Sequence, residues 1–179
     1  MQRWKAAFLV VLCAVVGACT RPHIFPERER QGVDQSFDFV KWKEQPMAYV
    51  GVKVEIGGRI VDATETDDGV RIVAAQLPVV EHPIYGPRND RGRVGAHEFA
   101  IMYPGKIERE ALGSGNKFVV LGWTQLPAEI EWQGTKRPML ALKATCIHIW
   151  KTGPQEIADF PNIQSEYYPL ERHTYCAAQ

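Results

Sequence analysis

The sequence predicts a mainly β protein, an OB-like small barrel of five antiparallel strands with one short helix between the third and fourth strands. Three observations predict this class. Apolar and polar residues alternate from residue 49, an Asp-Gly pair lies between two apolar runs, and glycines interrupt two of the strand-like segments. An open antiparallel sandwich with the same element order is the alternative.

The first two strands are predicted to form a hairpin. Valine and isoleucine recur at alternate positions over 50–60, which is typical of a half-buried strand. Gly57 and Gly58 lie in the middle of this strand and predict a bulge or a sharp coil. TDDG at 66–69 supplies the turn, and the second strand is expected over 70–77.

The rest of the domain alternates strands with turns. Prolines and glycines after residue 78 predict a long loop. The elements expected after it are a strand over 97–103, a short helix over 107–112 ended by GSGN, a strand over 117–126 with further pairing at 130–132, a turn at QGTKR, and a strand over 139–150.

The chain divides into four segments. We expect a leader over 1–18, a tether and lead-in over 19–48, the β domain over 49–150 and a C-terminal tail over 151–179. Prolines and a charge run favour a solvated tether. Aromatic residues in its latter half predict that this half docks on the domain: Phe37, Phe39 and Trp42.

The N-terminus has the pattern of an export signal. Arg3 and Lys5 precede the apolar stretch AAFLVVLCAVV at 6–16. This stretch is shorter than the roughly 20 residues that a membrane-spanning helix needs. It matches the apolar core of a secretory signal, which is usually about 7–15 residues long.

The last four residues of this region, Val16 to Cys19, resemble the lipobox of a bacterial lipoprotein signal. The resemblance implies cleavage before Cys19, a diacylated thioether on its sulfur and an acylated amine. Residue 20 is Thr. In lipoproteins of this kind, the absence of an Asp directly after the cysteine implies sorting to the outer membrane. The alternative is a plain cleaved signal in which Cys19 has no role.

Two cysteines remain beyond the lipobox, Cys146 and Cys176. An even pair in an exported chain predicts a disulfide that would fasten the tail to the domain. Strict alternation places Cys146 on the same face as Leu140 and Leu142, so a buried thiol is the alternative. A bulge, or a tail folded over that face, would reconcile the two.

Charge and motif spacing exclude several functional classes. Without the leader, 19 basic residues face 21 acidic ones, about −2, which gives no electrostatic reason to expect a nucleic acid partner. No histidine or cysteine has metal-ligand spacing, so neither a metal nor a cofactor is predicted. His148, beside Trp150, is expected to be structural. No serine has a nucleophile-elbow context, and Asp67 and Asp68 fit a turn, so the sequence predicts no enzyme.

Ligand-binding candidates lie in the loops that OB-like barrels use for this purpose. Trp132, Lys136 and Arg137 place an aromatic ring beside two cations, which suits a sugar or an anionic polymer. The alternative is that Trp132 packs on the rim and both cations are solvated. The arginines of the long loop form a second candidate: Arg88, Arg91 and Arg93.

Several stretches together resemble the Slp family of starvation-inducible outer-membrane lipoproteins. They are the lipobox at Cys19, YVGVKVEIGGRIV at 49–61, VRIVAAQLPV at 70–79, KFVVLGW at 117–123 and IHIW at 147–150. The resemblance implies an outer-membrane lipoprotein with a barrel-like periplasmic domain, and it implies no catalytic residues.

Two functional hypotheses follow. The first is a non-enzymatic lipoprotein, held through Cys19 at the periplasmic face of the outer membrane, that acts structurally or through an envelope protein. A role under starvation or other stress is what the family resemblance suggests. The second is a binding module for peptidoglycan or another envelope glycan.

Overall fold

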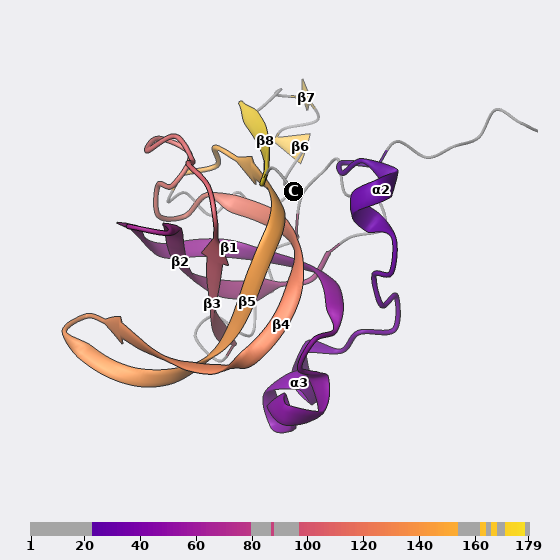
Figure 1. The fold of residues 1–179 in the computed structure, drawn as a ribbon. Coiled ribbons are helices and arrows are strands. Elements are labelled where there is room, and N and C mark those ends of the chain that lie inside the picture. The colour runs from indigo at the N-terminus through magenta and orange to yellow at the C-terminus, as the bar shows by residue number, and fades with distance from the viewer. Residues whose placement is uncertain are drawn as a thin grey trace, which may run out of the picture.

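The computed structural model describes residues 23–79, 87, 97–153 and 171–177, and the backbone of 162–163 and 166–167. Cys19 and the loop arginines 88, 91 and 93 lie outside these residues. Figure 1 shows the elements, which in chain order are α2 (Glu27–Arg30), α3 (Phe39–Glu44), the 3-10 helix η1 (Pro46–Tyr49), β1 (Lys53–Thr66), β2 (Gly69–Leu77), β3 (Glu98–Tyr103), β4 (Lys117–Trp132), β5 (Thr135–Trp150), β6 (Asn162–Ile163), β7 (Glu166–Tyr167) and β8 (Arg172–Cys176).

Five of the strands close into a ring. The main sheet has the order β3-β2-β1-β4-β5-β8, with antiparallel neighbours. β3 also pairs in parallel with β5, Phe99–Met102 against Leu140–Lys143, and this pairing joins the two ends of the five-strand order. The closure confirms the mainly β prediction and is incompatible with an open sandwich.

β8 was not predicted as a strand. It pairs with β5 over Cys146–Trp150, beyond the point where β3 ends. Since an unpaired strand edge exposes backbone donors and acceptors, β8 protects the part of β5 that the short β3 leaves uncovered.

The prediction of a helix over 107–112 is wrong. The segment between β3 and β4 consists of bends and turns, with hydrogen bonds from Ala111 N to Glu108 O and from Leu112 N to Arg109 O. The Asn116 amide instead donates to the carbonyls of Glu110 and Ala111 and holds the turns in place.

Helices precede β1 instead, in the segment that was expected to dock. Asp38 caps α3, because its carboxylate accepts from Val40 N at 2.8 Å. This places Phe39 and Trp42 on the buried side of the helix, and Trp42 is fully buried in the core of the ring. α3 therefore closes one end of the ring, and the turns over 104–116 lie at the other end (Figure 1).

The interior of the ring is filled with side chains. Phe99 lies at its centre, with ring centroids 5.5 Å from Phe39 and 6.4 Å from Phe118. The aliphatic residues that share this core are Val54, Ile56, Ile60, Ile72, Ile101, Val120, Leu142, Ile147 and Ile149. The ring is thus a packed core, and its functional surface is its outside.

The Gly57–Gly58 pair has a different role from the predicted bulge. The bulge of β1 against β2 lies between Ile60 and Asp62. A Cβ on Gly58 would lie 2.4 Å from Phe118 Cζ and 2.9 Å from the Ala75 carbonyl oxygen. Gly58 is therefore required because the Phe118 ring crosses directly over the backbone of β1.

Candidate functional site

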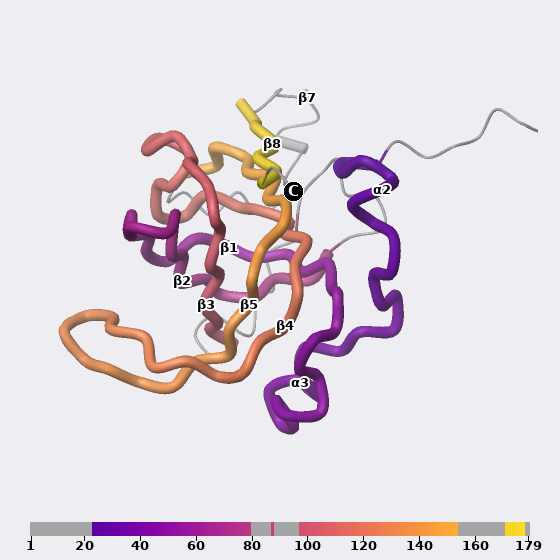
Figure 2. Tube along the Cα trace, in the orientation of Figure 1, coloured from indigo at the N-terminus to yellow at the C-terminus, as the bar shows by residue number. Residues whose placement is uncertain are grey.

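The ligand-binding candidates lie on the distal half of the β4–β5 hairpin, which projects from the ring as an arm (Figure 2). Gln133 and Gly134 form its turn and both have positive φ, 52° and 72°. Such a two-residue turn matches the twist of the paired strands. The turn predicted at QGTKR is confirmed, and Trp132 pairs with Thr135 across it.

The structure brings Trp132 and Arg137 together. The Arg137 guanidinium carbon lies 4.2 Å from the centroid of the Trp132 ring. The same guanidinium forms an ion pair with Glu98 at the start of β3. Lys136 is exposed and pairs in register with Glu131. Two of the three candidates are therefore already engaged by partners within the domain.

The arm packs on the outer face of the ring through apolar contacts. Ile130 and Met139 from the arm form a buried cluster with Val73 of β2 and Ala100 of β3, and the half-buried Trp132 packs against it. This arrangement supports the alternative in which Trp132 packs against the domain. Glycan binding at Trp132, Lys136 and Arg137 stays a prediction.

Asp67 and Asp68 lie in the β1–β2 turn, where they were expected. A cavity of about 440 Å³ separates this turn from residues 104–107 and is lined by both carboxylates and Lys106. Among the described residues no group of three or more His, Cys, Asp or Glu side chains is placed to hold a metal ion.

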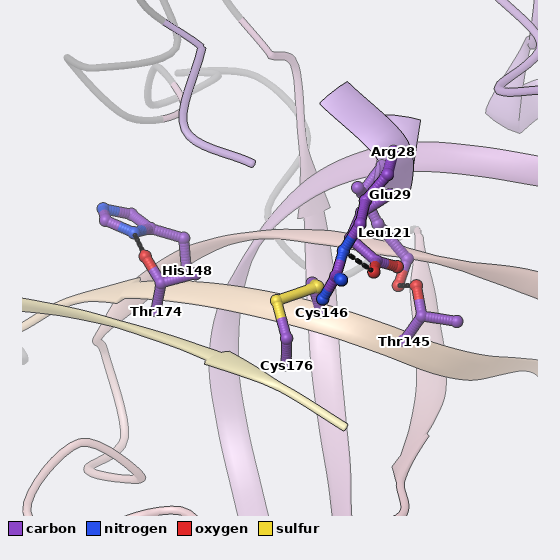
Figure 3. The surroundings of a disulfide bond; sticks show 8 residues. All are labelled: Arg28, Glu29, Leu121, Thr145, Cys146, His148, Thr174 and Cys176. Carbon is purple, nitrogen blue, oxygen red and sulfur yellow. Dashed lines mark hydrogen bonds and ion pairs between the residues drawn. A yellow bond between two sulfur atoms is a disulfide. The ribbon is translucent and has the colours of Figure 1, made fainter. Parts of the chain in front are cut away.

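The predicted disulfide is present. Cys146 of β5 and Cys176 of β8 are bonded and face each other in register (Figure 3). β5 has an extra residue, Thr145, opposite the step from Leu121 to Gly122. This bulge turns Cys146 away from the face of Leu142 and Ala144, so the two expectations for Cys146 are reconciled.

The N-terminal segment over 24–33 crosses the outer face of β4 and β5. Phe25 is buried against Leu121, Cys146 and Trp150, and Ile24 and Val33 pack beside it. Further along, the Lys53 ammonium of β1 donates to the Gln31 carbonyl at 3.0 Å. We call residues 24–33 the strap.

Burial near the strap shifts the pKa of one carboxyl group. Burial raises the pKa of Glu55 on β1, and the positive charge of Arg30 opposes this rise.

Sequence reasoning treated 19–48 as tether and identified only the aromatic residues of its latter half. Phe25 was missed, because two adjacent apolar residues in a stretch rich in proline and charge give no periodic signal.

Comparison with protein families identifies the family of this chain. The family model described as the outer membrane lipoprotein Slp family matches residues 16–176. The chain belongs to the Slp family of outer membrane lipoproteins. The matched stretch begins at Val16, where the stretch that resembles a lipobox begins, and ends at Cys176 of the disulfide. This confirms the resemblance and the outer-membrane assignment, and the family is not a known enzyme family.

Comparison with curated proteins and with solved structures gives no significant match. Within the described part of the chain, no helix has the length and apolar character required to cross a bilayer.

Proposed function

We propose that this Slp-family protein is a non-enzymatic domain held at the periplasmic face of the outer membrane by lipid on Cys19, where it serves a structural or partner-binding role in the envelope. The observation that carries the proposal is the extent of the family match, which includes the lipobox from Val16 to Cys19. A thiol at this position is the nucleophile that accepts the lipid.

The disulfide supports the choice of compartment. Disulfides persist in oxidising environments such as the periplasm and are rare in the cytosol. The Cys146–Cys176 bond joins two strands and its Cys146 sulfur lies in a fully buried residue, so it is part of the fold.

The use of the buried polar groups supports a non-enzymatic role. Lys53, Lys117 and Thr152 each donate to a backbone carbonyl of a distant segment of the chain, and Asn116 donates to a carbonyl of the turns before β4. Thr124 likewise donates to the Tyr49 carbonyl. These groups are committed to holding loops against strands, which is what a structural domain requires. The strand order, with β3 parallel to β5, supports an OB-like barrel as the description of the ring.

The Cys19→Ser variant tests the anchor. Each buried methylene contributes about 0.8 kcal/mol and a single acyl chain binds only marginally, so stable attachment requires the two or three chains on this cysteine. We expect wild-type protein in the outer-membrane fraction and the Cys19→Ser protein absent from it.

Cys13→Ser is the matched control, because it changes a leader cysteine outside the lipobox and should leave the protein in the outer membrane. The proposal fails if Cys19→Ser protein, with its leader removed, still fractionates with the outer membrane as the wild type does.

A further inference from the structure

The exposed apolar side chains of the domain gather at one corner. Among the described residues six large hydrophobic side chains are exposed, and four of them lie in two neighbouring segments, 45–52 and 123–126: Met47, Val50, Trp123 and Leu126. Isolated exposed hydrophobic residues are ordinary, whereas clusters of them mark interaction sites. The cluster is therefore a candidate interaction surface.

Backbone hydrogen bonds join the two segments. Gly51 N donates to Thr124 O at 2.9 Å, and Thr124 N donates to Val52 O at 3.0 Å. Thr124 Oγ1 also donates to Tyr49 O. Residues 45–52 and 123–126 thus form a single surface, which we call the apolar corner. It carries no charged residue.

Lysines flank the aromatic member of the apolar corner. Trp123 of β4 pairs with Lys53 on β1 and with Lys143 on β5, so a Lys-Trp-Lys row crosses three strands. The Lys53 ammonium lies 5.6 Å from the Trp123 ring centroid, and Lys143 is exposed. The Lys53 ammonium is buried and bonded to the strap, so Lys143 is the lysine of this row that can reach a ligand. An exposed tryptophan beside an exposed lysine suits a membrane interface, where the ring lies at headgroup level and the ammonium group meets anionic phosphates.

The strap limits how far this surface can be from the bilayer. Phe25 packs on Leu121, which lies two residues before Trp123 and on the same side of β4. Cys19 precedes Phe25 by six residues, which span at most about 20 Å. With Cys19 lipidated, the membrane surface is held within that distance of the strap.

We propose that the apolar corner docks on the phospholipid surface of the membrane and fixes the orientation of the domain on its anchor. This proposal rests on the lipid anchor proposed above. Docking places Met47, Trp123 and Leu126 at the headgroup boundary and directs the opposite end of the ring, with residues 104–116, away from the bilayer.

A fluorescent probe at the corner tests the docking. The full lipidated protein, carrying Met47→Cys labelled with nitrobenzoxadiazole, is reconstituted into vesicles of phosphatidylethanolamine and phosphatidylglycerol that contain a nitroxide-labelled lipid. Met47 is 68% exposed, so the label fits without repacking. The control probe is Arg109→Cys, on the exposed turns at the other end of the ring. Because docking inserts a side chain about 5–10 Å into the headgroup boundary, we expect quenching at least about threefold greater at 47 than at 109.

A second substitution removes the affinity of the corner for lipid. Leu126→Glu places a charge on the corner and should reduce quenching at position 47 to the level seen at 109. Val79→Glu is the matched control, because it charges an exposed hydrophobic residue that lies outside the corner, and it should leave quenching unchanged.

Flotation of the same vesicles separates the two proposals. Protein that floats but shows equal quenching at both sites retains the anchor and overturns the docking. Protein that does not float overturns the anchor and the docking together. A blue shift at 47 that grows with protein density and is insensitive to the nitroxide lipid means that a second copy covers the corner, and this also overturns the proposal.

Discussion

His148 links the closing strand to the ring. It lies on β5, only 8% exposed, with Nδ1 at 2.6 Å from Thr174 Oγ1 on β8 and its ring 4.4 Å from the Trp150 ring. This confirms the expectation of a structural histidine. Burial, together with the positive charges of Arg172 and His173, lowers the pKa of His148 to about 4.

The lowered pKa of His148 predicts that the domain loses stability in mild acid. The unfolded chain binds a proton near pH 6.5 and the folded chain only near pH 4, so the contribution is complete above pH 6.5 and is lost as the pH falls toward 4. We expect the free energy of unfolding in urea to be about 2 kcal/mol lower at pH 5 than at pH 7 through this group.

The His148→Gln variant should lose that part of the pH dependence. His23→Gln is the control, because His23 is exposed and should leave the wild-type dependence intact. Equal losses of stability between pH 7 and pH 5 in wild type and His148→Gln would show that this histidine does not couple β8 to pH.

At the scale of elements, the attachment of β8 to the ring depends on a few specific contacts. It has five residues with alternating half-buried and exposed side chains, which bury little apolar surface. It is held by its pairing with β5, by the Cys146–Cys176 bond and by the ion pair of Lys151 with Glu171, the residue before β8, at 2.7 Å. Exposed ion pairs contribute little, so the disulfide is the stronger of the two side-chain attachments.

Removing the disulfide should release β8 before the ring unfolds. The bond spans 30 residues, which corresponds to about 3–4 kcal/mol in the chain-entropy account. In the Cys146→Ala/Cys176→Ala variant we expect the amides of Arg172–Cys176 to lose hydrogen-exchange protection, while those of β1 and β4 stay protected. Wild-type protection of the β8 amides in this variant would contradict the claim, and reduced wild-type protein provides the matched comparison.

At the scale of the whole molecule, the ring strands could be predicted from the sequence, whereas the segments that cover the ring, namely the strap, α3 and β8, could not. Period-two alternation identified the five ring strands, because each has one face on a common core. The helix predicted over 107–112 failed because Ile107 and Ala111 face the ring from a chain of turns. α3 did leave a signal that was missed, with Asp38 as an N-cap before the apolar pair Phe39 and Trp42.

At the candidate site, too, contacts between residues close in sequence could be predicted and contacts between distant residues could not. Pairing across the hairpin turn follows from the sequence of 132–137, so the proximity of Trp132 and Arg137 could be anticipated. The ion pair of Arg137 with Glu98 could not, because it joins residues 39 apart through the closure of the ring. The apolar corner was visible as two uncharged runs, 45–52 and 118–128, but only the fold places them side by side.

The domain is a packed ring, and we propose that the strap on its outer face ties it to an N-terminus that is lipidated on Cys19. The most direct test of that account is the intact mass of the protein purified from outer membranes. The account predicts a chain that begins at Cys19 and carries a diacylglyceryl group and an amide-linked acyl chain on that residue. A mature chain that begins at another residue, or that has an unmodified Cys19, would contradict it.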